Sequence, residues 1–129
     1  MARAVGDFSG LTGTSAQEVL EAIPAHAKAR NLLPIKGATQ EGIEYKWVEG
    51  RKTWRVRIHG PDPSAPAGSN ASQSWVVRIQ RGQQFMDATG TFHPRGVHNP
   101  ASPNYDPAAA NETHIPIQAP TSENDYSRC

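Results

Sequence analysis

Hydrophobic and polar residues alternate with a period of two through the middle of the chain. Two alternating runs, at 43–48 and 54–59, flank a four-residue turn, and a third run covers 75–80 after a stretch rich in Pro, Gly and Ser. Successive side chains of a strand point to opposite faces, so this pattern predicts a hairpin followed by a third strand.

The pattern weakens on both sides of this central region. Ser15 and Glu18 form a capping-box spacing with apolar residues at helical spacing after them, which predicts a short helix over 15–23 that continues irregularly toward Arg30. Prolines and glycines dominate 94–110 and predict a loop there. The segment 115–117 predicts a last short strand, which its central Pro places at an edge of the sheet.

These elements predict an α+β fold, with a short N-terminal helix packed on a four- to five-stranded antiparallel sheet. One domain is expected over residues 14–118, preceded by a linker or tail at 1–13 and followed by a flexible tail at 119–129.

Side-chain parity sorts the central strands into two unlike faces. One face is apolar and predicts the core; it holds Tyr45, Trp47, Trp54, Val56, Ile58, Trp75, Val77 and Ile79. The other face holds Glu44, Lys46, Arg55, Arg57, His59 and Arg78. Four cations against one carboxylate would repel one another unless an anion binds there, and phosphate matches the donor fork of arginine.

Charge along the chain supports this interpretation. The net charge is only +1, but residues 46–81 carry seven Lys or Arg against two Asp or Glu. A basic block of this kind favours polyanionic partners. The one cysteine, Cys129, excludes an internal disulfide and a Cys-based zinc site, and no apolar run is long enough to span a membrane.

The basic face, with histidines near it, suggests cleavage of RNA without a metal or cofactor. Such a reaction needs a base for the ribose 2′-OH, an acid for the leaving oxygen and cations for the phosphate. Of five histidines, His59 ends the Arg-rich strand and His114 enters the edge strand, and we expect these two to be the acid/base pair, with their individual roles left open. Arg57 and Thr113 complete the expected catalytic set. The expected substrate-binding residues are Lys46, Arg55 and Arg78.

The sequence lacks the motifs of several other chemistries. The carboxylates are scattered singly, and no Pro-Cys-x-x-Cys, Gly-rich phosphate loop or Gly-x-Ser-x-Gly occurs. Two rival interpretations remain. An ADP-ribosyltransferase is compatible with a strand Arg and the late Glu112 and would depend on NAD. A non-catalytic nucleic-acid-binding module would bind without forming product.

Several sequence blocks resemble the polymorphic toxin type 30 domain, over about residues 15–118. The blocks are Tyr45-Lys46-Trp47-Val48, Trp54-Arg55-Val56-Arg57-Ile58-His59-Gly60-Pro61-Asp62, Gly68-Ser69-Asn70-Ala71, Trp75-Val76-Val77-Arg78, Phe85-Met86-Asp87 and Asn111-Glu112-Thr113-His114-Ile115-Pro116.

The resemblance implies a predicted ribonuclease at the C-terminus of a larger secreted protein, of the Rhs or contact-dependent kind. It further implies delivery into the cytoplasm of a target cell, a cognate immunity protein as partner, and the fold shared by barnase, EndoU, the colicin RNases and RelE. We expect a monomer that acts on RNA and does not associate with membranes.

Overall fold

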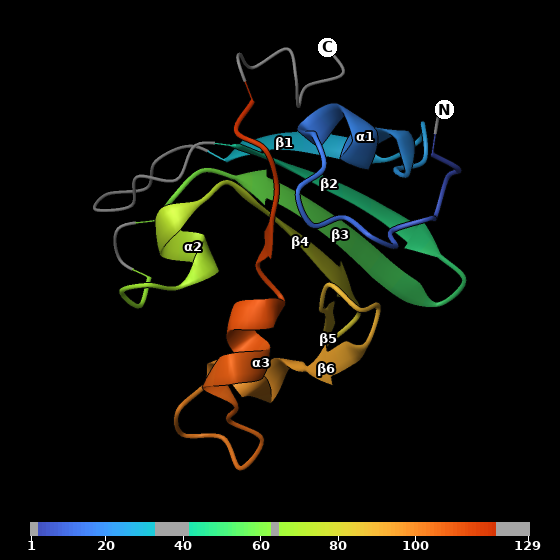
Figure 1. Cartoon of the computed structure of the whole chain (residues 1–129). Coiled ribbons are helices and arrows are strands. Elements are labelled where there is room, and N and C mark those ends of the chain that lie inside the picture. The colour runs from blue at the N-terminus through green and yellow to red at the C-terminus, as the bar shows by residue number, and fades with distance from the viewer. Residues whose placement is uncertain (1–2, 33–41, 63–64, 121–129) are drawn as a thin grey trace.

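A computed structural model describes residues 3–32, 42–62 and 65–120 of the chain. Its helices are short, and its strands are antiparallel and form one sheet (Figure 1). The elements in chain order are α1 Ala16–Glu21, β1 Lys28–Leu32, β2 Gly42–Glu49, β3 Lys52–His59, α2 Asn70–Gln73, β4 Val76–Arg81, β5 Gln84–Met86, β6 Phe92–Pro94, the 3-10 helix η1 Arg95–His98, α3 Pro107–Glu112 and β7 Ile115–Pro116.

The α+β class with an antiparallel sheet is confirmed, but the sheet has seven strands among the described residues and not four or five. Strands β1 to β6 follow one another in sequence order, and β7 pairs with β4. One edge of β4 therefore pairs with β3 along its length. Its other edge is shared by β7, at Val76 and Val77, and by β5, from Ile79 onward.

The prediction for the segment after the first helix was wrong. Helix α1 begins as expected, with the Ser15 hydroxyl accepting a hydrogen bond from the Glu18 N–H at 3.2 Å. It ends at Glu21, and Lys28–Leu32 forms strand β1 on the edge of β2. This short segment has no alternation of apolar and polar residues, because an edge strand is defined by its backbone pairing and has little to bury.

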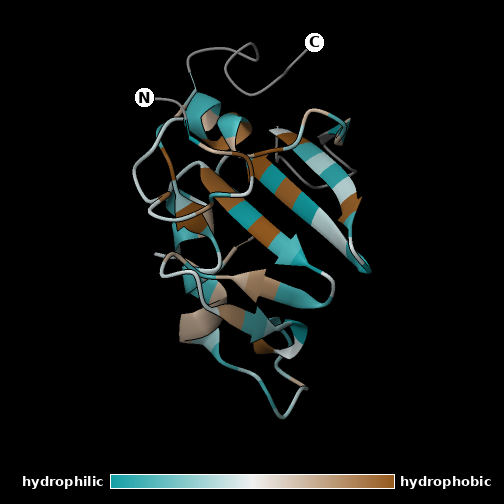
Figure 2. Cartoon of the chain, turned by 90° about the vertical axis from the view of Figure 1, so that its right-hand side faces the viewer, coloured by the Kyte–Doolittle hydropathy of each residue, from teal (hydrophilic) through white to brown (hydrophobic). Residues whose placement is uncertain are grey.

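The face of the sheet that packs in the core is the one that alternation of side chains predicted to be apolar. Buried residues of α1 pack in one cluster with Tyr45, Val56, Ile58 and Ile79 of the sheet. Figure 2 shows the alternating hydrophobic and hydrophilic positions along the strands. At the far end of this core, the Trp47 and Trp54 rings stack with centroids 5.8 Å apart.

The N-terminal segment also reaches this core. Phe8 and Leu11, within the predicted linker or tail, are 6% and 0% exposed, and Phe8 stacks on both Trp47 and Trp54. Phe8 and Leu11 therefore anchor this segment in the core, whereas residues such as Val5 are exposed. Of the C-terminal tail expected at 119–129, residues 121–129 lie outside the described part, and the domain limits at 14 and 118 stay predictions.

Three small helices occupy regions expected to be loops. Helix α2 interrupts the Pro/Gly/Ser stretch, and η1 and α3 lie within and just beyond 94–110. Each is only one or two turns long, so an amphipathic pattern had no length in which to appear. Among the described residues, no helix is long and apolar enough to cross a membrane.

Candidate functional site

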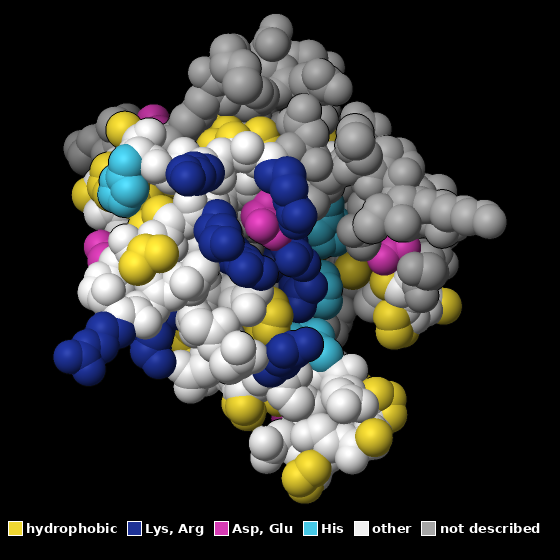
Figure 3. Space-filling view, turned by 180° about the vertical axis from the view of Figure 1, so that it is seen from behind, with side chains coloured by type: hydrophobic (Ala, Val, Ile, Leu, Met, Phe, Trp, Pro, Cys, Tyr) yellow, Lys and Arg dark blue, Asp and Glu magenta, His cyan; other side chains and the backbone are white. Residues whose placement is uncertain are grey.

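A row of charged side chains crosses the polar face of the sheet. The register pairs Arg30 with Glu44, Glu44 with Arg57, and Arg57 with Arg78. Ile115 pairs with Val77, so His114 enters the sheet next to Arg78 and extends the row. The space-filling view from behind shows Lys and Arg side chains gathered on this face, with histidines along their border (Figure 3). The basic face that alternation predicted is thus present in the structure.

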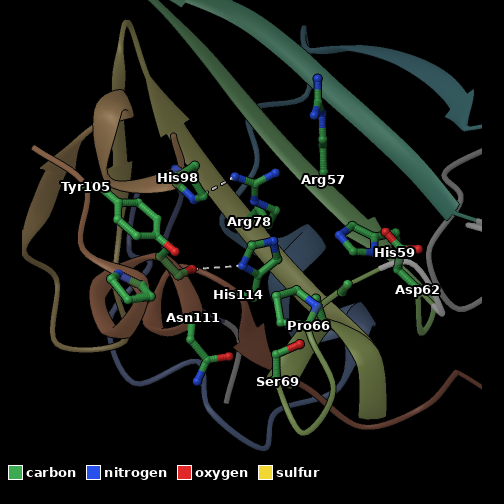
Figure 4. Close-up of a pocket in the computed structure, with 14 residues that line it drawn as sticks. Arg57, His59, Asp62, Pro66, Ser69, Arg78, His98, Tyr105, Asn111 and His114 are labelled. Carbon is green, nitrogen blue, oxygen red and sulfur yellow. Dashed lines mark hydrogen bonds between the residues drawn. The ribbon is translucent and has the colours of Figure 1, made fainter. Parts of the chain in front are cut away.

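A cavity of about 350 Å³ lies at the histidine end of this row. The strands supply its floor, while α2, α3 and the loops beside them supply its walls (Figure 4). Its lining residues are Arg57, His59, Asp62, Ala65, Pro66, Ser69, Ala71, Arg78, His98, Tyr105, Pro107, Ala110, Asn111 and His114.

Helices α2 and α3 are held together by one asparagine pair. The Asn70 N–H donates to Asn111 Oδ1 at 2.8 Å, and Asn70 Nδ2 donates to the His114 carbonyl at 3.1 Å. The Asp106 carboxylate caps the start of α3 by accepting from the Ala109 N–H. These contacts fix the backbone at His114 relative to the sheet, and so they position its ring over the cavity.

Arg78 is the central cation of the site. Its Nε is buried and has no hydrogen-bond partner, and its guanidinium carbon lies 4.5 Å from the centre of the Phe85 ring. Among the described residues no carboxylate forms an ion pair with it. Burial and the nearby charge of Arg57 lower the pKa of Arg78 to about 10. A partly buried cation without a counter-ion is unfavourable, so this position favours binding of an anion.

Arg57 stands at the border of the cavity. Its side chain extends toward β2, where Nε donates to Glu44 Oε2 at 2.6 Å (Figure 4 shows it turned away from the histidines). Glu44 is only 4% exposed and also pairs with Arg30 at 3.4 Å. Glu44 therefore orients Arg57 and forms no ion pair with Arg78.

His59 and His114 face the same space, with ring centroids 6.3 Å apart. His59 Nδ1 lies 3.0 Å from the Gly60 carbonyl, and His114 Nδ1 lies 2.9 Å from the Ala110 carbonyl. A carbonyl only accepts, so each Nδ1 carries the proton and each Nε2 has a lone pair in the neutral ring. Both rings are thus held in the tautomer that presents a proton-accepting nitrogen.

The pKa values of both histidines are lowered, for related reasons. Burial is the main cause for His59, and the cations Arg78 and Arg57 add to it, whereas Asp62 opposes them. Burial and Arg78 lower the pKa of His114 to about 4, and the neighbouring imidazoles act in the same direction. A carboxylate thus favours the protonated form of His59, while His114 is held neutral.

His98, which was not among the residues expected in the site, also lines the cavity. Its Nε2 lies 3.2 Å from Arg78 Nη2 and 3.1 Å from Thr113 Oγ1, and its ring centroid is 6.0 Å from that of His114. Because a guanidinium only donates, Nε2 accepts from Arg78 and the ring proton sits on Nδ1, which lies 3.3 Å from the Arg95 carbonyl. Burial and Arg78 lower the pKa of His98. His98 thus holds Arg78 in place.

The three other residues expected in the site, Thr113, Arg55 and Lys46, do not line the cavity. Thr113 is fully buried and does not line the cavity; its hydroxyl donates to the Ala110 carbonyl at 2.7 Å and contacts His98. Arg55 lines a separate hollow on the same face, and Lys46 is exposed opposite Arg55 on the neighbouring strand. Of the seven residues expected in the site, four line the cavity: His59, His114, Arg57 and Arg78.

Four polar residues of the cavity were missed by sequence reasoning: Asp62, Ser69, Tyr105 and Asn111. The Tyr105 hydroxyl points into the cavity (Figure 4). These residues lie on loops and short helices, where no periodic pattern indicates direction. Asp62 stands three residues after His59, and Asn111 stands three residues before His114. Proximity in sequence to these two histidines was therefore the signal that could have identified them. Within the described ranges, no group of three His, Cys, Asp or Glu side chains is placed to hold a metal ion.

The fold and the site define a small α+β domain with an arginine- and histidine-lined cavity at one end of a basic sheet face. The family model for bacterial toxin 30, Ntox30, matches residues 18–118. The chain therefore belongs to this family of bacterial toxin domains, and the resemblance noted in the sequence is confirmed. A search of the curated proteins and a search of the solved structures gave no match, so the relation to the barnase-like fold stays a prediction.

Proposed function

We propose that this toxin domain is a ribonuclease that needs no metal and cleaves RNA by attack of the ribose 2′-OH on the adjacent phosphate. The observation that carries the proposal is Arg78, a partly buried arginine with a buried, unpartnered Nε and no carboxylate partner among the described residues, which faces a cavity lined by histidines. A phosphodiester supplies the missing anion and places a reactive phosphorus beside the imidazoles.

The two imidazoles have the chemistry for opposite roles. His114, held neutral, takes the proton of the 2′-OH on its Nε2 while O2′ forms a bond to phosphorus. The P–O5′ bond breaks, and His59, whose protonated form Asp62 favours, gives a proton to O5′. The products are a 2′,3′-cyclic phosphate and a free 5′-hydroxyl. The phosphate charge raises the pKa of both rings on binding, which favours protonation of His59 in the complex.

The arginines and the buried polar residues support this reaction. Arg78 neutralises the non-bridging oxygens as negative charge grows on them, and Arg57 adds charge from the border of the cavity. His98 and Thr113 act as positioning residues. His98 Nε2 accepts a hydrogen bond from Arg78, and Thr113, whose hydroxyl donates to the Ala110 carbonyl, packs against the His98 ring. Lys46 and Arg55 contribute to binding RNA outside the cavity.

The position of Glu112 argues against the rival ADP-ribosyltransferase interpretation. Glu112 is exposed at the end of α3 and does not line the cavity, whereas that chemistry needs a carboxylate beside the bound NAD. The rival nucleic-acid-binding module does not account for two histidines held in proton-accepting tautomers.

Family membership supports a wider biological proposal. We propose that the domain is delivered, as the C-terminal part of a larger secreted protein, into the cytoplasm of a target bacterial cell. A cognate immunity protein then protects the producing cell, and the domain acts as a monomer.

Incubation of the purified domain with total RNA, with and without EDTA, tests the proposed activity. We expect cleavage in both samples, with products ending in 2′,3′-cyclic phosphate. An oligonucleotide with a 2′-deoxyribose at the cleaved nucleotide should resist. Loss of activity in EDTA with recovery on adding Mg²⁺ or Zn²⁺ would show that the mechanism is wrong. Modification that depends on NAD would instead support the transferase, and binding without product the binding module.

A further inference from the structure

A second and larger hollow, of about 610 Å³, lies on the same face of the sheet as the cavity. It runs between the β2–β3 turn and the β4–β5 turn, at the end of the strands far from His59. We call it the basic groove. Its lining residues are Arg51, Lys52, Thr53, Arg55, Arg57, Gln80, Arg81, Gly82, Gln83, Gln84, Phe85 and Arg95.

The groove is cationic, and of its cations only Arg57 has an ion pair with a described carboxylate, that of Glu44. Among the described residues that line it, none is Asp or Glu, and Arg51, Lys52, Arg55 and Arg95 form no ion pair within the described part of the chain. The Lys52 side chain lies across the β4–β5 turn, since a Cβ added at Gly82 would come within 3.4 Å of Lys52 Cδ. Like charges gathered in this way repel one another unless anions bind between them.

The basic groove lies next to the cavity and shares a lining residue with it. Arg57 lines both hollows. Phe85 and Arg95 join the groove to a third hollow, which is shared with Arg78, His98 and His114 of the cavity. A strand bound at Arg78 therefore has the groove beside it on the same sheet face.

The two hollows differ in the part of a nucleotide that they suit. Apolar residues such as Pro66, Pro107 and Ala110, together with Tyr105, line the cavity, which suits a base and its ribose. Polar and cationic side chains line the groove, which suits backbone phosphates. A nucleotide that enters the cavity has to leave any stack or duplex, so the chain on either side of it is single-stranded.

We infer that the basic groove binds the phosphates that flank the cleaved linkage of a single-stranded RNA, so that affinity grows as the strand is extended on one side of the cut. This inference rests on the proposed function for the identity of the ligand. It adds Arg51, Lys52 and Arg95 to the substrate-binding residues and predicts a substrate of several nucleotides.

Binding of non-cleavable strands tests the groove apart from the chemistry. Fluorescein-labelled 2′-deoxy oligonucleotides of increasing length, from two to ten nucleotides, are titrated with the whole chain at several salt concentrations, and fluorescence anisotropy is measured. For the long strands, Lys52→Ala and Arg95→Ala should each reduce the slope of log K against log salt by about 0.7, the value for one lost contact to a single strand. The dinucleotide should bind both variants with the same affinity as the wild type, because it is too short to reach the groove.

Lys28→Ala is the matched control, because Lys28 is an exposed strand lysine outside the groove. It should leave the slope unchanged. The inference is overturned if affinity does not grow with strand length or if both groove variants keep the wild-type slope. It is also overturned if Lys28→Ala reduces the slope as much as the groove variants do. Cleavage of the corresponding ribo-oligonucleotide separates the two proposals. Length-dependent binding without cleavage would contradict the proposed ribonuclease activity and support RNA binding in the groove. Cleavage without length-dependent binding would support the ribonuclease activity and contradict binding in the groove.

Discussion

At the scale of single residues, the site is defined by which ring nitrogens the protein occupies. The backbone carbonyls of Gly60 and Ala110 occupy Nδ1 of His59 and His114, and leave both Nε2 atoms for the substrate. Arg78 instead occupies Nε2 of His98. Three neighbouring imidazoles are thus held in two different ways, and of these three only His59 and His114 leave Nε2 available for the proton transfer that we propose.

Removal of either ring of the pair should therefore stop the reaction. We expect His59→Ala and His114→Ala each to lose about 10²–10⁴-fold in cleavage rate, the usual contribution of a general acid or base. In the proposed reaction the two rings act in one turnover, so the double variant should be hardly slower than either single variant. Cleavage of a labelled oligonucleotide and toxicity on expression in cells measure the effect.

Two variants control for general effects of histidine replacement. His26 is exposed and outside the cavity, so His26→Ala should be silent. His98→Gln keeps a hydrogen-bond acceptor near Arg78 and should retain more activity than His98→Ala. A folded His114→Ala protein with near-normal rate would exclude the pair and leave the arginines to carry the reaction through positioning and charge.

The lowered pKa values predict an acidic optimum for kcat/KM, which reports the free enzyme. The base must be neutral, so activity rises as pH rises through the pKa of His114, about 4. The acid must be protonated, so activity falls as pH rises through the pKa of His59, which burial holds below 6.5. The optimum should lie between these values. For kcat it should lie at higher pH, because bound phosphate favours both charged rings.

The variants assign the two limbs of this profile. Measured from pH 3.5 to 8.5, residual activity of His114→Ala should lack the acidic limb, and that of His59→Ala should lack the alkaline limb. The opposite pattern would exchange their roles as acid and base. A kcat/KM that is still rising at pH 7 would contradict the lowered pKa of His59.

At the scale of elements, the short β5–β6 hairpin holds Phe85 beneath Arg78, and one carboxylate closes the hairpin. Asp87 is 4% exposed and accepts hydrogen bonds from the Thr89 and Thr91 N–H groups, from the Thr89 hydroxyl and from His93 Nε2 at 2.6 Å. Burial opposes its ionised form, but these donors from Thr89, His93 and Thr91 lower the pKa of Asp87 to about 2.

Loss of the Asp87 carboxylate should destabilise the domain. Asp87→Ala removes the acceptor of several buried or partly buried donors, and we expect the free energy of unfolding in urea to fall by about 1–3 kcal/mol at pH 7. Since the folded pKa lies below the unfolded value of about 3.9, this contribution is present above pH 4 and is lost as pH falls toward 2. Asp7→Ala, which removes a similar but exposed turn contact to Ser9, should cost much less. Equal losses for both variants would contradict this account.

At the scale of the whole molecule, alternation along strands predicted more than any other signal. It placed Arg57, His59 and Arg78 on one face because a period of two is a property of the strand itself. His98, Tyr105 and Asn111 were not predicted as a site, because they reach the cavity through η1, a loop and α3, whose directions depend on tertiary contacts such as the Asn70–Asn111 pair. The number of strands was underestimated because β1 and β6 are short edge segments without alternation.

The N-terminal segment provides the last prediction, since it decides where the folded unit begins. The domain limit at residue 14 was set from composition, yet Phe8 and Leu11 fill the core between α1 and the Trp47–Trp54 stack. A Phe buried in this way contributes several kcal/mol, and Phe8→Ala should lower the free energy of unfolding by about 3 kcal/mol. Deletion of residues 1–13 should cost more and make the tryptophans accessible to solvent, which a red shift of their fluorescence would report. Val5→Ala is the control, because Val5 is 64% exposed and its replacement should be neutral. If the protein that lacks residues 1–13 has the same unfolding midpoint in urea as the wild type, the segment is a tail and the domain begins at residue 14.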